Sequence, residues 1–467
     1  SKLLIQRKSQ MNSSYQANEN LIFKTPLTDE KIYIREQSGR YQKIRRVLSF
    51  VLIFVFALIP MIEYQGHQAV YFDLQQQKIH LFSFTLFPQD FLIFTLIFIL
   101  AAFVLFYVTK FYGRVWCGFT CPQTIWMLMF NWVERRVEGT HNQSRALDRQ
   151  GISTNKIVKK ALKHFIWGSL SLITSLIFIS YFVPAKELYP AFFQAEASSL
   201  VVLWVLFFAG CTYINAGWIR EKMCQHMCPY ARFQSAMFDP STTLVTYDAN
   251  RGENRAKRKR SQVKTPEQGD CIDCNLCVQV CPVGIDIRDG LQYECINCGL
   301  CADACDMTMK QFNTPTGLIA FKQEVVPKTN WSRHLVYGSI VGVILLAIYI
   351  WANTWQSFEV NIIRDRQDLY SINQNGHVEN HYIFKIRNKT LSANQYEISV
   401  NGFEGATIEN SRQVEILPGE LRTISVVVYS IEEVTNFRSD LIFSIQEVNS
   451  KNKIDKVSSF YSGNKGW

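Results

Sequence analysis

The chain has 467 residues, of which 48% are apolar and 13 are cysteine, and its formal net charge is +10. A chain of this length exceeds one ordinary domain. Its apolar residues are concentrated in long uncharged runs, which excludes a simple soluble protein and predicts a membrane protein with soluble parts. Twelve cysteines lie in tight clusters with metal-ligand spacing, which indicates bound metal in a reducing compartment rather than disulfide bonds.

Uncharged runs predict the membrane part of the chain. Residues 1–46 form a polar arm that lacks the apolar core of a signal peptide. Beyond this arm, five runs of 16 to 19 residues predict transmembrane helices, because about 20 residues span a bilayer. Five such runs in one chain disfavour the alternative of buried core helices. The runs are 47–62, 91–108, 165–183, 200–216 and 335–351.

Basic residues are distributed unevenly between the segments that connect these runs. Ten Lys and Arg lie in 1–46, ten in 109–163 and fifteen in 217–333, against one each in 63–90 and 184–199. Loops rich in Lys and Arg stay in the cytoplasm. We therefore expect a multi-pass protein of a bacterial inner membrane, with the N-terminus and all three basic segments in the cytoplasm and the C-terminal segment in the periplasm.

Two similar cysteine pairs follow the second and fourth runs. They are Cys117-x-x-x-Cys121-Pro122 and Cys224-x-x-x-Cys228-Pro229, 107 residues apart, which indicates an internal duplication. Proline suits the first turn of a helix, so Cys121 and Cys228 are expected at helix N-termini, where the helix dipole favours a thiolate. The uncharged stretch 122–133 is too short to span and predicts an interfacial helix.

Two equivalent halves pack most simply about a pseudo-twofold axis, which would bring the four thiols into one site. Such a site is the predicted catalytic centre and could hold copper or a further metal cluster. The alternatives are that each pair forms a disulfide or merely packs. His226 is a weak candidate ligand, since a solvated side chain is the simpler interpretation. Cys211 lies within a run and is interpreted as helix packing.

The sharpest signal is a duplicated run of eight cysteines. Cys271, Cys274, Cys277 and Cys281-Pro282 are followed 24 residues later by Cys295, Cys298, Cys301 and Cys305. This is the bacterial two-cluster ferredoxin arrangement, in which the fourth cysteine of each run binds the other [4Fe–4S] cluster. Carried onto this chain, Cys305 completes the first cluster and Cys281 the second. The spacing is poor for zinc, the competing interpretation.

The C-terminal segment changes character. Alternating strands separated by turn residues predict an immunoglobulin-like sandwich over 356–467, with protein contact as its default role. The predicted domains are the arm 1–46, four helices with the cysteine pairs in 47–250, a linker and ferredoxin domain in 251–333, a fifth helix in 334–355 and this sandwich. The basic run 255–260 is interpreted as a contact with anionic lipid rather than with nucleic acid.

In the order and combination of these features, the chain resembles the cytochrome oxidase accessory proteins called CcoG, FixG or RdxA. The resemblance implies two [4Fe–4S] clusters and an oxidoreductase that reduces its substrate Cu(II) to Cu(I) for assembly of a cbb-type oxidase. The expected partners are membrane lipid, the copper ion, a copper transporter or chaperone and oxidase assembly factors, without nucleic acid; whether the chain forms a homodimer stays open. Two other interpretations stay open: a quinol-linked polyferredoxin that never binds copper, and an assembly scaffold without activity.

Overall fold

The computed structural model describes residues 31–467 except 263, 324–330, 366–367, 404, 410–412, 432–436, 449, 451 and 463–467. Most of the predicted N-terminal arm therefore lies outside the described residues. The chain divides into two compact units. Unit 1 comprises Ser1–Ile59, Ile97–Ser180 and Lys186–Leu345, and unit 2 comprises Pro60–Leu96, Tyr181–Ala185 and Leu346–Trp467.

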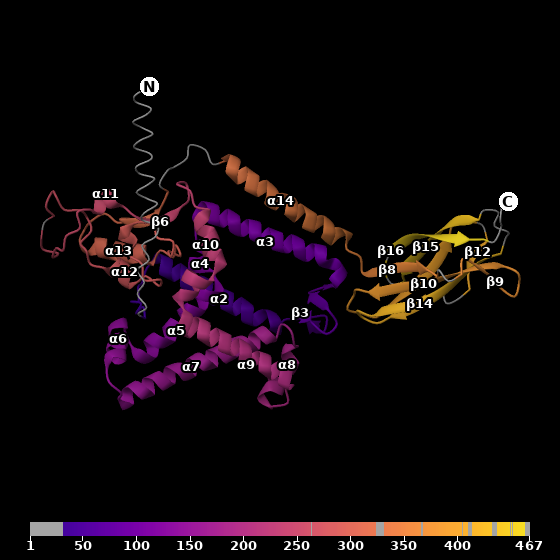
Figure 1. Cartoon of the computed structure of the whole chain (residues 1–467), viewed down its shortest axis with the longest axis horizontal. Coiled ribbons are helices and arrows are strands. Elements are labelled where there is room, and N and C mark those ends of the chain that lie inside the picture. The colour runs from indigo at the N-terminus through magenta and orange to yellow at the C-terminus, as the bar shows by residue number, and fades with distance from the viewer. Residues whose placement is uncertain are drawn as a thin grey trace, which may run out of the picture. The chain divides into compact units, whose positions relative to one another are not determined.

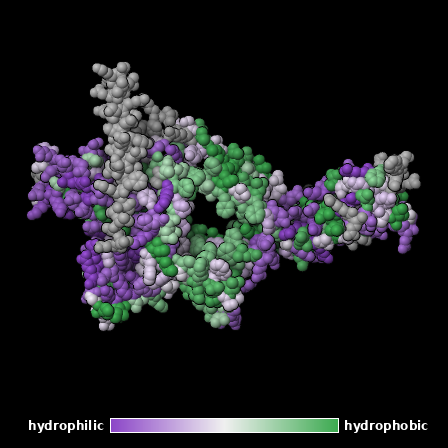
Figure 2. Space-filling view, viewed as in Figure 1, coloured by the Kyte–Doolittle hydropathy of each residue, from purple (hydrophilic) through white to green (hydrophobic). Residues whose placement is uncertain are grey.

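Within the described residues, five long helices confirm the predicted membrane part (Figure 1). Each is long and apolar enough to cross a bilayer, α9 when the turn that continues it to Ile219 is included, and Figure 2 shows hydrophobic side chains gathered over them. The first begins seven residues earlier than predicted, inside the polar arm. The prediction missed this start because basic residues occupy the first turns of the helix. The helices are α2 (Arg40–Leu58), α3 (Phe91–Tyr112), α7 (Thr154–Ile179), α9 (Ser199–Tyr213) and α14 (Trp331–Thr354).

A helix follows each of the two predicted cysteine pairs in unit 1. Cys121 is the N-cap of α5 (Pro122–Glu138), and Cys228 is the N-cap of α10 (Pro229–Ala236), each with proline at the first helical position. The predicted interfacial helix is longer than expected and ends only at Gly139, whose φ is 95°. The neighbouring helices are α4 (Val115–Phe119), α6 (His141–Arg149) and α8 (Ala185–Phe193).

The chain between α9 and α10 adopts π-helical turns that nothing in the sequence predicts. They are η3 (Ile214–Ile219) and η4 (Met223–Met227), separated by Arg220 at φ 49° and ψ −120°. Single π-helical turns are rare and occur frequently at functional sites. Here they carry Cys224 and lead directly into Cys228.

The ferredoxin domain is a small α+β structure within unit 1. Strands β6 (Leu244–Tyr247) and β7 (Ile319–Lys322) pair antiparallel and pack on the long helix α13 (Leu300–Gln311). Buried Val245, Ile287 and Ile319 form one core with Cys277. The remaining elements are α11 (Ala249–Gly252), α12 (Leu276–Gln279) and η5 (Ile287–Asp289).

Unit 2 contains the predicted immunoglobulin-like sandwich, which the structure confirms. One sheet has the order β12-β14-β10-β8, with β9 on β10, and the other has β13-β11-β15-β16. Alternate residues of each strand point into a shared aromatic core, where Tyr382, Phe384, Tyr396 and Phe443 are fully buried. The strands are β8 (Phe358–Arg364), β9 (Ser371–Ile372), β10 (Val378–Asn388), β11 (Asn394–Asn401), β12 (Ala406–Ile408), β13 (Gln413–Ile416), β14 (Leu421–Ser430), β15 (Arg438–Glu447) and β16 (Lys453–Tyr461).

Two small antiparallel sheets, one of two strands and one of three, occupy the segment between the first two long helices and were not predicted from the sequence. This segment also belongs to unit 2 and is followed by the single turn η2 (Pro88–Asp90). Lys389 of the sandwich binds Asp90 at 2.9 Å, so the segment and the sandwich are joined within this unit. The strands of this segment are β1 (Glu63–Tyr64), β2 (His67–Gln68), β3 (Val70–Asp73), β4 (Lys78–Leu81) and β5 (Phe84–Leu86).

Candidate metal centre

Both ferredoxin cysteine runs are curled by left-handed backbone at the same positions. Asp273 and Asn297, 24 residues apart, have φ of 48° and 55°, and Asn275 and Gly299 have φ of 56° and 73°. Asparagine, aspartate and glycine tolerate this conformation best. Alternating left-handed residues turn a loop into a concave cradle whose N–H groups face an anion. The local sequence thus explains why each run wraps around one object.

The first group of four thiols is named the outer set. Burial raises the pKa of Cys305 to about 12, and the neighbouring thiols of Cys277, Cys271 and Cys274 raise it further. The fourth cysteine of the second run therefore lies among the first three of the first run. Cys274 is exposed. The outer set is Cys271, Cys274, Cys277 and Cys305.

The other four thiols form the inner set. Burial raises the pKa of Cys281 to about 12, and the thiols of Cys298 and Cys295 add to it. Burial likewise raises the pKa of Cys301 well above its usual range, with Cys298, Cys295 and Cys281 next in effect. Four thiolates per cluster, exchanged between the two runs, fit two [4Fe–4S] clusters. The inner set is Cys281, Cys295, Cys298 and Cys301.

All four cysteines of the Cys-Pro pairs line one cavity of about 280 Å³, which we call the four-thiol cavity. It lies in unit 1, between α4, the start of α5, the π-helical turns and α10. The structure therefore brings together Cys117, Cys121, Cys224 and Cys228, as the duplication predicts. Met223 and Asn215 also line it, and the buried side-chain oxygen Oδ1 of Asn215 has no hydrogen-bond partner among the described residues.

The thiols of this cavity influence one another in every pairing. Burial raises the pKa of Cys117 to about 11, opposed by the guanidinium of Arg114, while Cys121 and Cys228 raise it further. Burial also raises the pKa of Cys224 to about 12, with contributions from Cys121, Cys117 and Cys228. Cys121 in turn is raised by burial and by Cys228. The raised pKa values of Cys117, Cys121 and Cys224 favour their protonated thiols at neutral pH, so metal binding to them must release protons.

The wall of this cavity is also the wall of the inner set. Cys117 belongs to the same buried cluster as Cys298, with Cys281 and Cys295 packed against it. Gly118 lies directly on the ligand loop: a Cβ built on it would stand 2.6 Å from the carbonyl oxygen of Ile296 and 2.9 Å from Cα of Cys298. Only glycine permits so close an approach of two backbones. The two candidate metal sites thus meet at one contact.

Two buried arginines that the sequence analysis did not single out flank this contact. Arg45 of α2 donates from Nε to the carbonyl oxygen of Gly118 at 2.8 Å. Arg114 donates to Oε1 of Gln234 at 3.2 Å and to the carbonyl oxygen of Tyr293. Their exposed fractions are 2% and 1%. For Arg114 the sequence does contain a signal, because this arginine lies at the end of an apolar run and three residues before Cys117.

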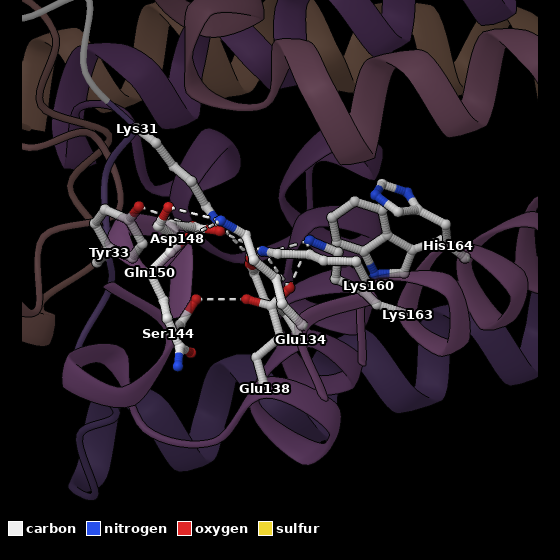
Figure 3. A network of polar contacts seen from close by, with 12 residues as sticks. Lys31, Tyr33, Glu134, Glu138, Ser144, Asp148, Gln150, Lys160, Lys163 and His164 are labelled. Carbon is white, nitrogen blue, oxygen red and sulfur yellow. Dashed lines mark hydrogen bonds and ion pairs between the residues drawn. The ribbon is translucent and has the colours of Figure 1, made fainter. Parts of the chain in front are cut away.

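A network of ion pairs holds the π-helical turns that line part of the cavity. Glu134 of α5 pairs with Arg220, between the two π-helical turns, at 2.5 Å, and with Lys31 at 2.6 Å. Burial works against the charge of Glu134, but Arg220 and Lys31 overcome it and lower its pKa to about 2. Figure 3 shows Lys31, Glu134, Glu138 and Lys163 converging. The network therefore fixes the turn that carries Cys224 to the helix that follows Cys121.

The weaker candidates lie elsewhere. His226 is exposed and is not among the residues that line the four-thiol cavity, and Cys211 is exposed on α9. Within the part of the chain that the structure describes, no three His, Cys, Asp or Glu side chains stand close enough to hold a single metal ion.

Comparison with protein-family models matches three parts of the chain. Residues 219–324 match the 4Fe-4S dicluster domain, and residues 92–139 match a 4Fe-4S binding domain. Residues 349–463 match the IG-like fold at the C-terminal of FixG. The predicted iron–sulfur domain and the predicted sandwich are therefore confirmed.

Whole-chain relatives agree with these matches. The nitrogen fixation protein FixG of Rhizobium meliloti is 31% identical over 85% of this chain and 84% of its own length. Proteins RdxB and RdxA of Cereibacter sphaeroides are 33% and 32% identical over 79% and 82% of this chain, and over 82% and 86% of their own. A solved FixG-related protein from Vibrio parahaemolyticus is similar to 23% of this chain and 99% of its own, at 22% identity and a TM-score of 0.22. The chain is a member of the FixG, RdxA and RdxB family of membrane iron–sulfur proteins.

Proposed function

We propose that this protein reduces Cu(II) to Cu(I) in the four-thiol cavity and thereby supplies Cu(I) for assembly of a cbb-type oxidase. The observation that supports it most strongly is the contact of Gly118 with the Ile296–Cys298 backbone. Gly118 follows Cys117, which lines the cavity, so this segment of α4 packs directly on the ligand loop of the inner set. An electron held at the inner set is therefore next to any copper in the cavity.

The thiols of the cavity determine the direction of the reaction. Cu(II) enters, thiols lose protons to bind it, and soft thiolate ligands stabilise Cu(I) over Cu(II). When bound at the two cysteine sets, [4Fe–4S] clusters supply one-electron storage. Reduction of each Cu(II) takes one electron, which the clusters held by the two cysteine sets would supply. A reductant of low potential must then restore that electron.

A second candidate for the cavity is a third [4Fe–4S] cluster. Residues 92–139 match a 4Fe-4S binding domain, yet they contain only Cys117 and Cys121. Such a cluster takes four cysteine ligands. Cys224 and Cys228 line the same cavity and would supply the remaining two.

The copper assay uses the full-length protein, purified without oxygen, reduced with dithionite and desalted. We expect it to convert added Cu(II) to Cu(I), detected with a Cu(I)-specific chelator, to a limit of about one Cu(I) for each loaded cluster. Oxidised protein is the control. Protein with full iron and sulfide content that produces no Cu(I) would refute the proposal, and an iron content of about twelve per chain would favour the third cluster over copper.

The positions of basic residues support a cytoplasmic ferredoxin domain and a periplasmic sandwich. In this orientation Cu(I) is released on the cytoplasmic side, where a copper transporter or chaperone would receive it. We expect protease added to spheroplasts to cleave the sandwich and leave residues 271–305 intact, as detected with epitope tags. Cleavage of the ferredoxin domain from outside would reverse the orientation.

A further inference from the structure

The outer set lies in neutralised surroundings. Cys274 is exposed, so solvent reaches this set. Arg288 acts on Cys277, but its guanidinium is paired with Asp273 at 2.7 Å and with Asp286 at 2.5 Å. The charge of this arginine is therefore compensated twice. Asp306, adjacent to Cys305, adds a further negative charge.

The inner set lies in different surroundings, with Val280, Val283 and Ile285 buried around it. Two buried cations, Arg45 and Arg114, stand next to it. Among the described residues, no carboxylate comes within 4.0 Å of either guanidinium. Both donate to neutral carbonyl and amide oxygens, and Arg114 also forms a hydrogen bond with the thiol of Cys117.

Thiols of the inner set act on both cations at short range, and Arg114 also acts on Cys117 of the four-thiol cavity. The thiols of Cys298 and Cys281 have a larger electrostatic effect on Arg45 than Asp303 has. Asp303 already accepts hydrogen bonds from the backbone of α2. Arg114 acts on Cys295 more strongly than the adjacent Glu294 does. A buried charge without a counter-ion is costly. The negative charge of a thiolate-ligated cluster would be that counter-ion.

We propose that Arg45 and Arg114 make the inner cluster the more easily reduced of the two, so that electrons enter at the exposed outer set and collect beside the four-thiol cavity. This inference rests on the proposed function, because it gives that function an entry point and a direction. Each step moves one electron from a low-potential donor to the outer set and then to the inner set. The donor is oxidised by the one electron that the protein gains.

The direction follows from the charge that reduction adds. Each reduction makes a cluster more negative by one unit, which a nearby cation stabilises. Burial opposes this, because it disfavours added charge. Two full charges that act through the protein interior outweigh the loss of solvent, since a low dielectric strengthens their attraction.

The test is a potentiometric titration of the full-length protein in detergent, without oxygen or copper, with dithionite as reductant and EPR as readout. Cys274→Ser identifies the outer signal, because it changes an exposed ligand of that set only. We expect two midpoint potentials, with the inner one higher. Arg45→Gln and Arg114→Gln should each lower the inner reduced-to-oxidised ratio by at least ten-fold, which is 59 mV for one electron.

Matched variants separate charge from structure. Arg45→Lys and Arg114→Lys keep the cation and should stay close to the wild-type potential. Arg260→Gln removes an exposed arginine that binds Gln311 and should shift neither signal. The inference is overturned if the wild-type clusters have equal potentials, if the inner one is lower, or if iron-loaded Gln variants keep the inner potential. If a Gln variant fails to load iron, the order of the two midpoint potentials in the wild-type protein decides the test. Because no copper is present, these results are independent of the copper assay.

Discussion

Serine at any one of Cys117, Cys121, Cys224 or Cys228 is expected to lower the rate of Cu(II) reduction by about 100-fold or more, equivalent to about 2.7 kcal/mol or more of barrier. All four thiols line one cavity, and each acts electrostatically on the others. Serine retains the size of the side chain but is a poor ligand for a soft metal ion. The measurement is Cu(I) formation under anaerobic conditions, together with copper bound per chain.

The shared cavity makes a sharper prediction for double variants. Cys117→Ser combined with Cys224→Ser should lose little more activity than either change alone, because residues that act on one site are not additive. Cys211→Ser is the matched control: it alters a thiol on α9 that does not line the cavity and should leave the rate unchanged. If one pair proves dispensable while the other abolishes activity, the four thiols do not act as one site.

Most of the architecture was predictable from the uncharged runs and the cysteine spacing in the sequence. Five uncharged runs identified the long helices, and the eight-cysteine repeat identified the ferredoxin domain, because both signals are local. The Cys-Pro order also located the first turns of α5 and α10. These signals need no knowledge of which segments meet in space.

Features that depend on tertiary contact were not predictable in the same way. The π-helical turns arise where Arg220 is held by Glu134 and Gln123, from a helix almost a hundred residues earlier. Arg45 and Arg114 become important only because both approach the inner set. The strands β3 to β5 were missed because they are only three or four residues long, too short for alternation to show.

Gly118→Ala is expected to separate the two candidate metal sites. The added Cβ would stand 2.6 Å and 2.9 Å from backbone atoms of the ligand loop, which cannot rotate away as a side chain could. The α4 turn or the loop must shift, and overpacking of this kind costs about 1–3 kcal/mol. We expect a lower unfolding temperature and a rate of Cu(II) reduction about ten-fold or more lower, equivalent to about 1.4 kcal/mol or more of barrier.

The control is Gly210→Ala in α9, where the added Cβ meets nothing within 4 Å. Alanine is the better helix former by about 1 kcal/mol, so this variant should be at least as stable as wild type and equally active. Iron content and the midpoint potentials report whether the clusters themselves survive in Gly118→Ala. Full iron content, unchanged potentials and slow copper reduction would identify the contact of Gly118 as the electron path. Unimpaired copper reduction in the same variant would show that electrons reach the cavity by another route, and the close approach of the two backbones would then serve packing alone.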